Sequence, residues 1–249
     1  MSTFYINKEQ IEDNTIRIIG EDLHHIKDVL RVKSGEKLDF CDEDAIRYNC
    51  KLSKYCDSFA IFEILSKTSE TTESCVNITL YQGLPRQERM DLVVQKASEL
   101  GVQAIIPVNM DRSILKIDDK NESKKIDRWN KIAKEACSQS GRQKLSIVSR
   151  PVNFKNIIEN IEKYDIVLLP YENEKVVSLK EALKTFSNKE SKSLNIAVII
   201  GPEGGFSDSE ISSICNISNV KVVTLGKRIL RTETAGPAVA AMLLYEFEL

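Results

Sequence analysis

A glycine-rich segment near the C-terminus has the residue types of a ligand-binding loop. Three glycines within the five residues of Gly201–Gly205 allow positive φ angles and close approach of the backbone to a ligand. The segment lacks the Lys-Ser/Thr pair of a Walker motif and the G-x-G-x-x-G order of a dinucleotide site, so neither ATP nor NAD is predicted to bind. The alternative is a tight turn that only caps the next helix, with Ser207 as N-cap and Glu210 three residues later.

A second candidate loop, Leu225–Pro237, combines apolar, basic and hydroxyl residues. It leads into a predicted final helix, Ala238–Phe247, and Pro237 suits the first turn of that helix. The helix is apolar on nearly every side except at Glu246. Such a helix must be buried all round, either in a subunit interface or in the core of the monomer.

The cysteines and histidines argue against metal chemistry. None of the six cysteines forms a C-x-x-C pair, and the only two histidines, His24 and His25, are adjacent in the chain. Structural zinc sites and disulfide frameworks need closer, paired spacing. We therefore predict no metal site, and the histidine content also argues against a Ser-His-Asp triad.

Alternating strands and helices are predicted to position the two loops. The predicted strands are Val76–Tyr81, Ala104–Val108, Leu145–Val148, Asp165–Leu169, Leu194–Ile200 and Val220–Leu225, and the predicted helices are Arg86–Leu100, Ser123–Ser140, Asn156–Ile161 and Ala238–Phe247. This alternation predicts a parallel α/β sheet. Open sheets of this kind bind ligands just past the carboxyl ends of their strands, where both candidate loops begin. The exit of a third strand, Leu168–Glu172, is ordinary by its sequence.

The first 70 residues have a different pattern, in which short strands are interrupted by one helix near Asp22–Leu30. Short strands in a segment of this size predict a small β-barrel. The polar run Ser66–Ser74 is the best candidate linker. We therefore predict two domains, residues 1–70 and residues 75–249.

Composition and charge limit the class of protein. The chain has 249 residues, of which 42% are hydrophobic and 29% charged. It contains no apolar run of about 18 residues and no signal-peptide pattern, so we expect a cytoplasmic protein without a membrane span. The net charge is −2, but residues 124–150 carry eight basic against two acidic residues. This segment is either a phosphate-facing patch or a solvated helix face.

Several motifs together resemble the SPOUT methyltransferases, in particular the RsmE-type family of 16S ribosomal RNA uridine-N3 methyltransferases. The motifs are Ile200–Phe206 with Leu225–Ala235; His25 with Leu30-Arg31-Val32 and Gly35; Arg89-Met90 with Gln95–Val102; and Arg112-Ser113, Arg128-Trp129 and Glu135–Arg142. The resemblance covers nearly the whole chain. Departures are Ser98 and Cys137, where Thr and Ala are expected, and the variable Gly236-Pro237 pair.

The resemblance implies an α/β fold in which a small N-terminal PUA-like β-barrel precedes a SPOUT α/β trefoil-knot domain. It also implies a homodimer, S-adenosylmethionine as the cofactor, and a uridine of the small ribosomal subunit as the acceptor. The implied cofactor-binding residues are Leu169, Gly201, Gly205, Leu225, Gly226, Ile229, Leu230, Thr234 and Ala235.

Methylation of uracil N3 requires loss of the N3 proton or stabilisation of a uracil anion. Arg231, in the second loop, is the predicted cationic stabiliser. Glu203 and Glu233 are candidates for the base or for the group that orients Arg231, and a loop-capping role is an alternative for each.

The predicted RNA-binding residues are Arg31, Arg86, Arg89, Lys96, Arg112, Arg128 and Arg142, with Lys27 and Lys33 as further candidates in the barrel. Contacts of this type to phosphates position RNA without selecting a sequence. Some of these arginines are also expected to form internal ion pairs. The expected partner is small-subunit ribosomal RNA within the subunit.

Three other functions are compatible with the sequence. The first is another SPOUT enzyme that modifies a different base or a ribose 2′-oxygen. The second is a non-catalytic RNA-binding or assembly factor on the same scaffold. The third is a small-molecule enzyme with a doubly wound sheet.

Overall fold

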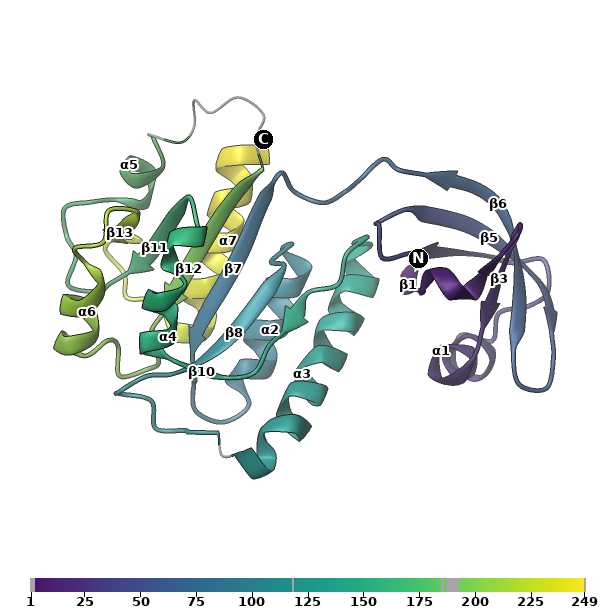
Figure 1. Cartoon of the computed structure of the whole chain (residues 1–249), viewed down its shortest axis with the longest axis horizontal. Coiled ribbons are helices and arrows are strands. Elements are labelled where there is room, and N and C mark those ends of the chain that lie inside the picture. The colour runs from purple at the N-terminus through teal and green to yellow at the C-terminus, as the bar shows by residue number, and fades with distance from the viewer. Residues whose placement is uncertain (1–2, 118, 185, 187–192, 249) are drawn as a thin grey trace. The chain divides into compact units, whose positions relative to one another are not determined.

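A computed structural model describes residues 3–117, 119–184, 186 and 193–248 of the chain (Figure 1). The chain divides into two compact units. The first comprises residues 1–73 together with 137–144, and the second comprises residues 74–136 and 145–249. No helix within the described residues is long and apolar enough to cross a membrane.

The first unit is built on a six-stranded sheet with the order β1-β4-β5-β6-β3-β2. Its strands are β1 (Thr3–Tyr5), β2 (Ile11–Glu12), β3 (Thr15–Ile18), β4 (Lys37–Cys41), β5 (Arg47–Tyr55) and β6 (Ala60–Thr68), and a 3₁₀ turn, η1 (Lys8–Gln10), precedes β2. Only β1 and β4 pair in parallel; the other neighbours are antiparallel. Phe40 and Phe62 are fully buried at the centre of its core, with ring centroids 4.9 Å apart.

The helix predicted at Asp22–Leu30 is divided in the structure. An α-helical turn, α1 (Gly20–His24), continues as a π-helix, η2 (His25–Val29). Leu30 N–H donates to the His25 carbonyl, five residues earlier, which is the wider bonding pattern of a π-helix. The segment ends at Arg31, whose φ of +54° is unusual for a residue with a side chain.

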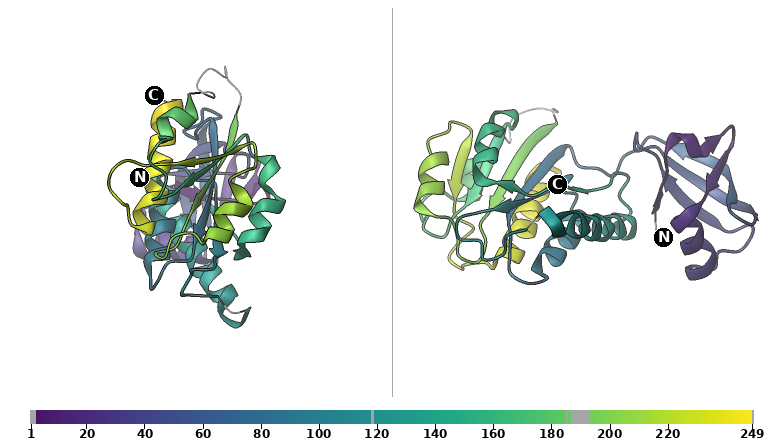
Figure 2. Two further views of the ribbon diagram at one scale, coloured as in Figure 1. Left: turned by 90° about the vertical axis from the view of Figure 1, so that its left-hand side faces the viewer. Right: turned by 60° about the horizontal axis from the view of Figure 1, so that its bottom comes forward.

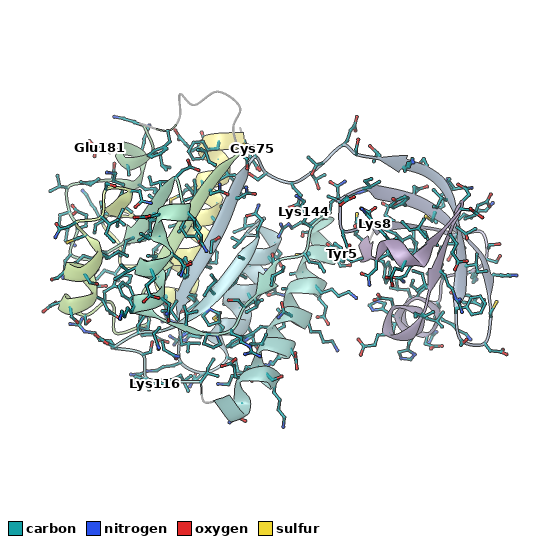
Figure 3. The ribbon with its side chains drawn as sticks, in the orientation of Figure 1. Tyr5, Lys8, Cys75, Lys116, Lys144 and Glu181 are labelled. Carbon is teal, nitrogen blue, oxygen red and sulfur yellow. The ribbon has the colours of Figure 1, made fainter. Side chains whose placement is uncertain are left out.

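Residues 137–144 complete the first unit. The Arg142 guanidinium pairs with the Glu73 carboxylate at 2.7 Å, and these two side chains are only 6% and 7% exposed. Gln143 donates to the carbonyls of Ala45 and Glu70. The hydroxyl of Tyr5, labelled in Figure 3, donates to the Arg142 carbonyl at 2.9 Å, and burial raises the pKa of Tyr5 above its ordinary value.

The second unit is built on a sheet in which every recorded pairing is parallel, as predicted. The strand order is β10-β8-β7-β12-β11-β13, with β9 beside β8. Its elements are β7 (Val76–Gly83), α2 (Arg89–Glu99), β8 (Ala104–Asn109), α3 (Asp119–Ser140), β9 (Ile147–Val148), β10 (Val152–Asn153), α4 (Phe154–Glu159), η3 (Ile161–Lys163), β11 (Ile166–Pro170), α5 (Leu179–Leu183), β12 (Leu194–Ile200), α6 (Asp208–Ile214), β13 (Val220–Val223) and α7 (Thr232–Glu248).

Both faces of this sheet are buried. Along β12, Ile196 and Val198 face one hydrophobic cluster, whereas Ala197 and Ile199 face another. The first cluster joins the sheet to α2, α5 and α7, and the second joins it to α4 and α6. The left view of Figure 2 shows α7, in yellow, on one side of the sheet and α4 and α6, in green, on the other. This burial explains the unbroken apolar runs of the central strands.

The final helix differs from the prediction. α7 begins at Thr232 rather than at Ala238, so Pro237 lies inside the helix and not in its first turn. The proline costs the helix the hydrogen bond that an N–H at this position would donate to the Glu233 carbonyl. The first residue of the helix, Thr232, donates a hydrogen bond to the Gly201 carbonyl and accepts one from the Gln82 amide, and both partners are remote from it in the sequence.

Candidate functional site

A cavity of about 310 Å³ lies at the carboxyl ends of the neighbouring strands β12, β11 and β13. Three segments form most of its wall: the exit of β11, the glycine-rich loop after β12, and the loop between β13 and α7. Helices α2 and α7 contribute the rest. The lining residues are Arg89, Pro170, Tyr171, Glu172, Lys175, Ile200–Glu203, Gly205, Phe206, Thr224–Thr232 and Ala235. The site therefore forms where parallel α/β sheets commonly bind ligands.

The glycine-rich loop folds closely on itself. A Cβ atom added to Gly201 would lie 3.3 Å from the backbone of Gly205. Gly205 has a φ of +67°, and a Cβ there would lie 3.1 Å from the Glu172 carboxylate. Glycine is therefore required at Gly205 for the backbone conformation and at Gly201 for close packing.

Thr232 connects the start of α7 to the other wall segments. Its hydroxyl donates to the Gly201 carbonyl at 2.6 Å and accepts a hydrogen bond from the Gln82 amide at 2.8 Å. Gln82 is fully buried at the end of β7. These bonds hold the glycine-rich loop, β7 and α7 in a defined arrangement.

Most of the predicted cofactor-binding residues lie together in the cavity wall. Seven of the nine line it: Gly201, Gly205, Leu225, Gly226, Ile229, Leu230 and Ala235. Leu169 and Thr234 are not in the wall. Leu169 is fully buried in β11, and Thr234 lies in the first turn of α7 and is exposed to solvent.

The three predicted catalytic residues have different surroundings. Arg231 lines the cavity, and its side chain is 77% exposed. Glu203 also lines the cavity, and its Oε1 accepts hydrogen bonds from the Arg86 backbone and the Arg89 guanidinium, both at 2.9 Å.

Glu233 is the most buried of the three, with a side chain that is 11% exposed. Its carboxylate lies 3.8 Å from the Arg89 guanidinium and 3.9 Å from that of Arg231. Its Oε2 atom accepts no hydrogen bond from any described residue. Glu203 thus holds a loop in place, whereas the Oε2 atom of Glu233 is buried, pairs with Arg89 at 3.8 Å and accepts no hydrogen bond from the described residues.

A second cavity, of about 360 Å³, is lined by three arginines and one glutamate. Its lining residues are Arg86, Arg89, Arg112, Ile114, Glu203 and Gly204. Arg89 and Glu203 line both cavities. Three of the predicted RNA-binding arginines are therefore gathered next to the first cavity.

Three other predicted RNA-binding residues are engaged in ion pairs. Lys96 pairs with Glu99 at 3.0 Å within α2. Arg128 pairs with Asp91 and also lies 3.4 Å from Glu88.

Arg142 is buried against Glu73, so its guanidinium cannot reach RNA without breaking a buried ion pair. We therefore assign Arg142 a structural role in the first unit and not the predicted contact with RNA. Arg31 also belongs to the first unit, where it is exposed.

Sequence reasoning missed the contribution of the β11 exit. Pro170, Tyr171, Glu172 and Lys175 line the cavity, although this exit is ordinary by its sequence. Only the position of β11 between β12 and β13 brings these residues between the two candidate loops.

Comparison with known proteins agrees with this arrangement. A family model described as an RNA methyltransferase domain matches residues 72–244, and one described as an RNA methyltransferase PUA domain matches residues 18–65. Over 245 residues the chain is 32% identical to the ribosomal RNA small subunit methyltransferase E of Bacillus subtilis, covering 98% of this chain and 95% of that protein. The chain belongs to this RNA methyltransferase family.

Solved structures show the same fold. The ribosomal RNA small subunit methyltransferase E of Neisseria gonorrhoeae, bound to S-adenosylmethionine, has a TM-score of 0.83 and 30% identity, covering 98% of this chain and 97% of that one. A Legionella pneumophila protein solved with S-adenosylmethionine has a TM-score of 0.83 and 29% identity, with 98% and 96% covered. The predicted RsmE-type family and the fold class, an α/β SPOUT knot domain after a PUA-like domain, are confirmed.

Proposed function

We propose that this RNA methyltransferase transfers the methyl group of S-adenosylmethionine to N3 of a uridine in small-subunit (16S) ribosomal RNA. The observation that carries the proposal is the cavity between the exits of β11, β12 and β13, which contains the predicted cofactor-binding glycines and Arg231. Relatives that match nearly the whole chain are named for small-subunit methylation, and one of them binds S-adenosylmethionine.

The residues of the cavity fit this cofactor. A volume of about 310 Å³ is in the usual range for small-molecule sites. Backbone groups at Gly201 and Gly205 are uncovered because neither residue has a side chain, and a Cβ at either position would crowd the loop. We propose that Leu225 and Leu230 contact the adenine, that Gly226, Ile229 and Ala235 complete the wall, and that Leu169 and Thr234 support it.

When bound, S-adenosylmethionine supplies an electrophilic methyl carbon. The chain must then align the acceptor nitrogen with that carbon and accommodate the charge that develops on uracil. Arg231, exposed at the cavity wall, is suited to stabilise negative charge on a uracil carbonyl oxygen. We propose Glu233 as the acceptor of the N3 proton because its carboxylate lies 3.9 Å from Arg231, which lines the cavity, and Glu203 positions Arg86 and Arg89.

The first unit supplies further RNA contacts in this proposal. Arg31, Lys27 and Lys33 of the PUA-like domain, residues 1–70, are the candidates. The assembled small subunit is the proposed substrate, which implies a cytoplasmic enzyme. Residues 75–249 form the proposed methyltransferase domain.

We also propose a homodimer formed through α7 and α2. Met242 and Tyr245 are exposed three residues apart on α7, and so lie on one face of that helix. Leu92 is exposed on α2, which shares a hydrophobic core with α7. Large apolar side chains exposed on adjacent helices are typical of subunit interfaces.

The proposed reaction can be tested with labelled S-adenosylmethionine and small subunits from a strain that lacks this enzyme. After digestion of the RNA to nucleosides, mass spectrometry should find the label in N3-methyluridine. Label in another nucleoside would instead favour a different SPOUT reaction. Absence of both label and cofactor binding by calorimetry would favour a non-catalytic RNA-binding factor.

A further inference from the structure

We propose that the second cavity binds a nucleotide of the RNA substrate, with Arg86 and Arg112 contacting its phosphate and Ile114 contacting its base. This inference rests on the proposed function, because it supplies that reaction with a site for the acceptor nucleotide. We call the cavity lined by Arg86, Arg89, Arg112, Ile114, Glu203 and Gly204 the arginine cavity.

The position of the arginine cavity suits an acceptor site. It is formed by the segments that follow β7, β8 and β12, three neighbouring strands of the sheet. Because Arg89 and Glu203 line both cavities, a nucleotide in the arginine cavity lies directly beside the proposed cofactor site. Methyl transfer requires this proximity of acceptor and donor.

The charge of the arginine cavity favours an anion. Three arginines and one glutamate, Glu203, line the cavity. Arg89 pairs with Glu203 and also lies 3.8 Å from Glu233, which leaves Arg86 and Arg112 as the candidates for an anion. The Arg86 guanidinium has no hydrogen-bond or ion-pair partner in the described part of the chain, and only its backbone N–H is engaged. The Arg112 guanidinium donates one hydrogen bond to the Gly204 carbonyl at 3.3 Å, and its ion pair with Asp208, at 4.0 Å and almost fully exposed, is weak.

The backbone segments that carry Arg86 and Arg112 are held in place before any ligand binds. The Arg86 N–H donates to Glu203, and the next residue, Gln87, adopts a φ of +57°. Strained backbone of this kind persists where surrounding contacts hold it, often at functional sites.

The turn that presents Arg112 is held in a similar way. The Met110 N–H donates to the Ser113 hydroxyl, and the Asp111 N–H donates to the Glu210 carboxylate. Arginines on restrained segments lose less conformational freedom when they bind a phosphate.

The shape of the arginine cavity favours a nucleotide over a small inorganic anion. Ile114, at its edge, is 64% exposed and offers an apolar surface that a phosphate group cannot use. A volume of about 360 Å³ also exceeds what one phosphate group needs. A nucleotide uses both the apolar and the cationic surface, because its base packs against Ile114 and its phosphate binds Arg86 and Arg112.

The test compares Arg86→Ala and Arg112→Ala with Lys155→Ala, which removes one exposed positive charge on α4. Binding to unmethylated small subunits is measured with S-adenosylhomocysteine present, so that no turnover is needed, and over a range of salt concentrations. Each arginine variant should bind at least about fivefold more weakly, and its slope of log affinity against log salt should fall by about 1. The control should behave like the unmodified protein.

A competition experiment tests whether the arginine cavity prefers a nucleotide to a nucleoside or to inorganic phosphate. Uridine 5′-monophosphate should displace the subunits from the unmodified protein better than uridine or inorganic phosphate, and this preference should disappear in the arginine variants. Equal competition by inorganic phosphate would overturn the nucleotide site. Arginine variants with the affinity and salt slope of Lys155→Ala would overturn the phosphate contact, even if the enzyme methylates normally. If the unmodified protein does not methylate the subunits but the arginine variants still bind more weakly and with a smaller salt slope, only the proposed function is refuted.

Discussion

Arg231 is exposed at the wall of the proposed cofactor cavity, 3.9 Å from the Glu233 carboxylate, where its guanidinium can approach a bound substrate. We predict that Arg231→Ala lowers the rate constant of methyl transfer by about 10²-fold, because one preorganised cation is lost where negative charge develops. Cofactor affinity should change less than about threefold. Single-turnover kinetics and calorimetry measure the two quantities. A large loss of cofactor affinity at an unchanged rate constant would refute the assigned role.

The two glutamates should differ in the kinetic constant that they affect. Glu233→Gln removes the proposed proton acceptor, so kcat should fall by about 10²-fold with little change in KM. Glu203→Gln weakens the hydrogen bonds to Arg86 and Arg89. We therefore expect it mainly to raise KM for small subunits. Steady-state kinetics give kcat and KM for both variants. A raised KM for Glu233→Gln together with a lowered kcat for Glu203→Gln would exchange the two roles.

At the scale of elements, Asp111 connects the exit of β8 to the start of α6. Its carboxylate accepts hydrogen bonds from the Ser207 and Ser209 hydroxyls, which hold the pKa of Asp111 below its ordinary value of 3.8. A group whose pKa is lowered by folding contributes stability above that value, and the contribution is lost as the pH falls through the folded-state pKa.

Asp111→Asn should therefore lower the free energy of unfolding at neutral pH, and the difference from the unmodified protein should shrink below pH 3.8. Urea denaturation at pH 7 and at about pH 3 measures both differences. A difference that is independent of pH would show that the carboxylate charge makes no contribution to stability.

At the scale of the whole molecule, the buried pair of Arg142 and Glu73 joins two distant parts of the sequence in the first unit. We predict that Glu73→Gln lowers the free energy of unfolding by about 3–5 kcal/mol, because it leaves a buried guanidinium without its counter-charge. Glu70→Gln, the same charge change at an exposed neighbour, should have little effect. Urea denaturation measures both, and equal effects would contradict the structural role of Arg142.

The proposed homodimer is also a property of the whole molecule. Tyr245→Asp places a charge on the apolar face of α7, where the native side chain is 71% exposed. We expect the variant to sediment as a monomer under conditions in which the unmodified protein is a dimer, and Lys155→Asp to remain a dimer. A dimeric Tyr245→Asp variant would place the interface elsewhere.

Local patterns in the sequence were sufficient to predict much of the fold. The apolar run of β12 was predicted with the bounds observed. Five residues of the helix predicted at Arg86–Leu100 were expected on its inward face; Met90, Val93, Val94 and Ala97 are buried, whereas Leu100 is half-buried and follows the end of α2. These features depend on the period at which neighbouring residues meet the core. The family resemblance depended on short motifs, and these also predicted the knot fold, which general topology rules disfavour.

Only the tertiary structure decided how the site is assembled. The order of strands places the β11 exit between the two loops, so Glu172 reaches the cavity. Ion pairing distinguishes Arg86, whose guanidinium has no partner among the described residues, from Arg142, which is buried against Glu73.

The bond between Arg89 and Glu203 joins residues 114 positions apart. The sequence determined which segments are buried and which chemistry they can carry, because both depend on residue type and local spacing. Strand order and the ion-pair partners of each arginine depend on contacts between segments that are remote in the chain, so a local pattern cannot predict them.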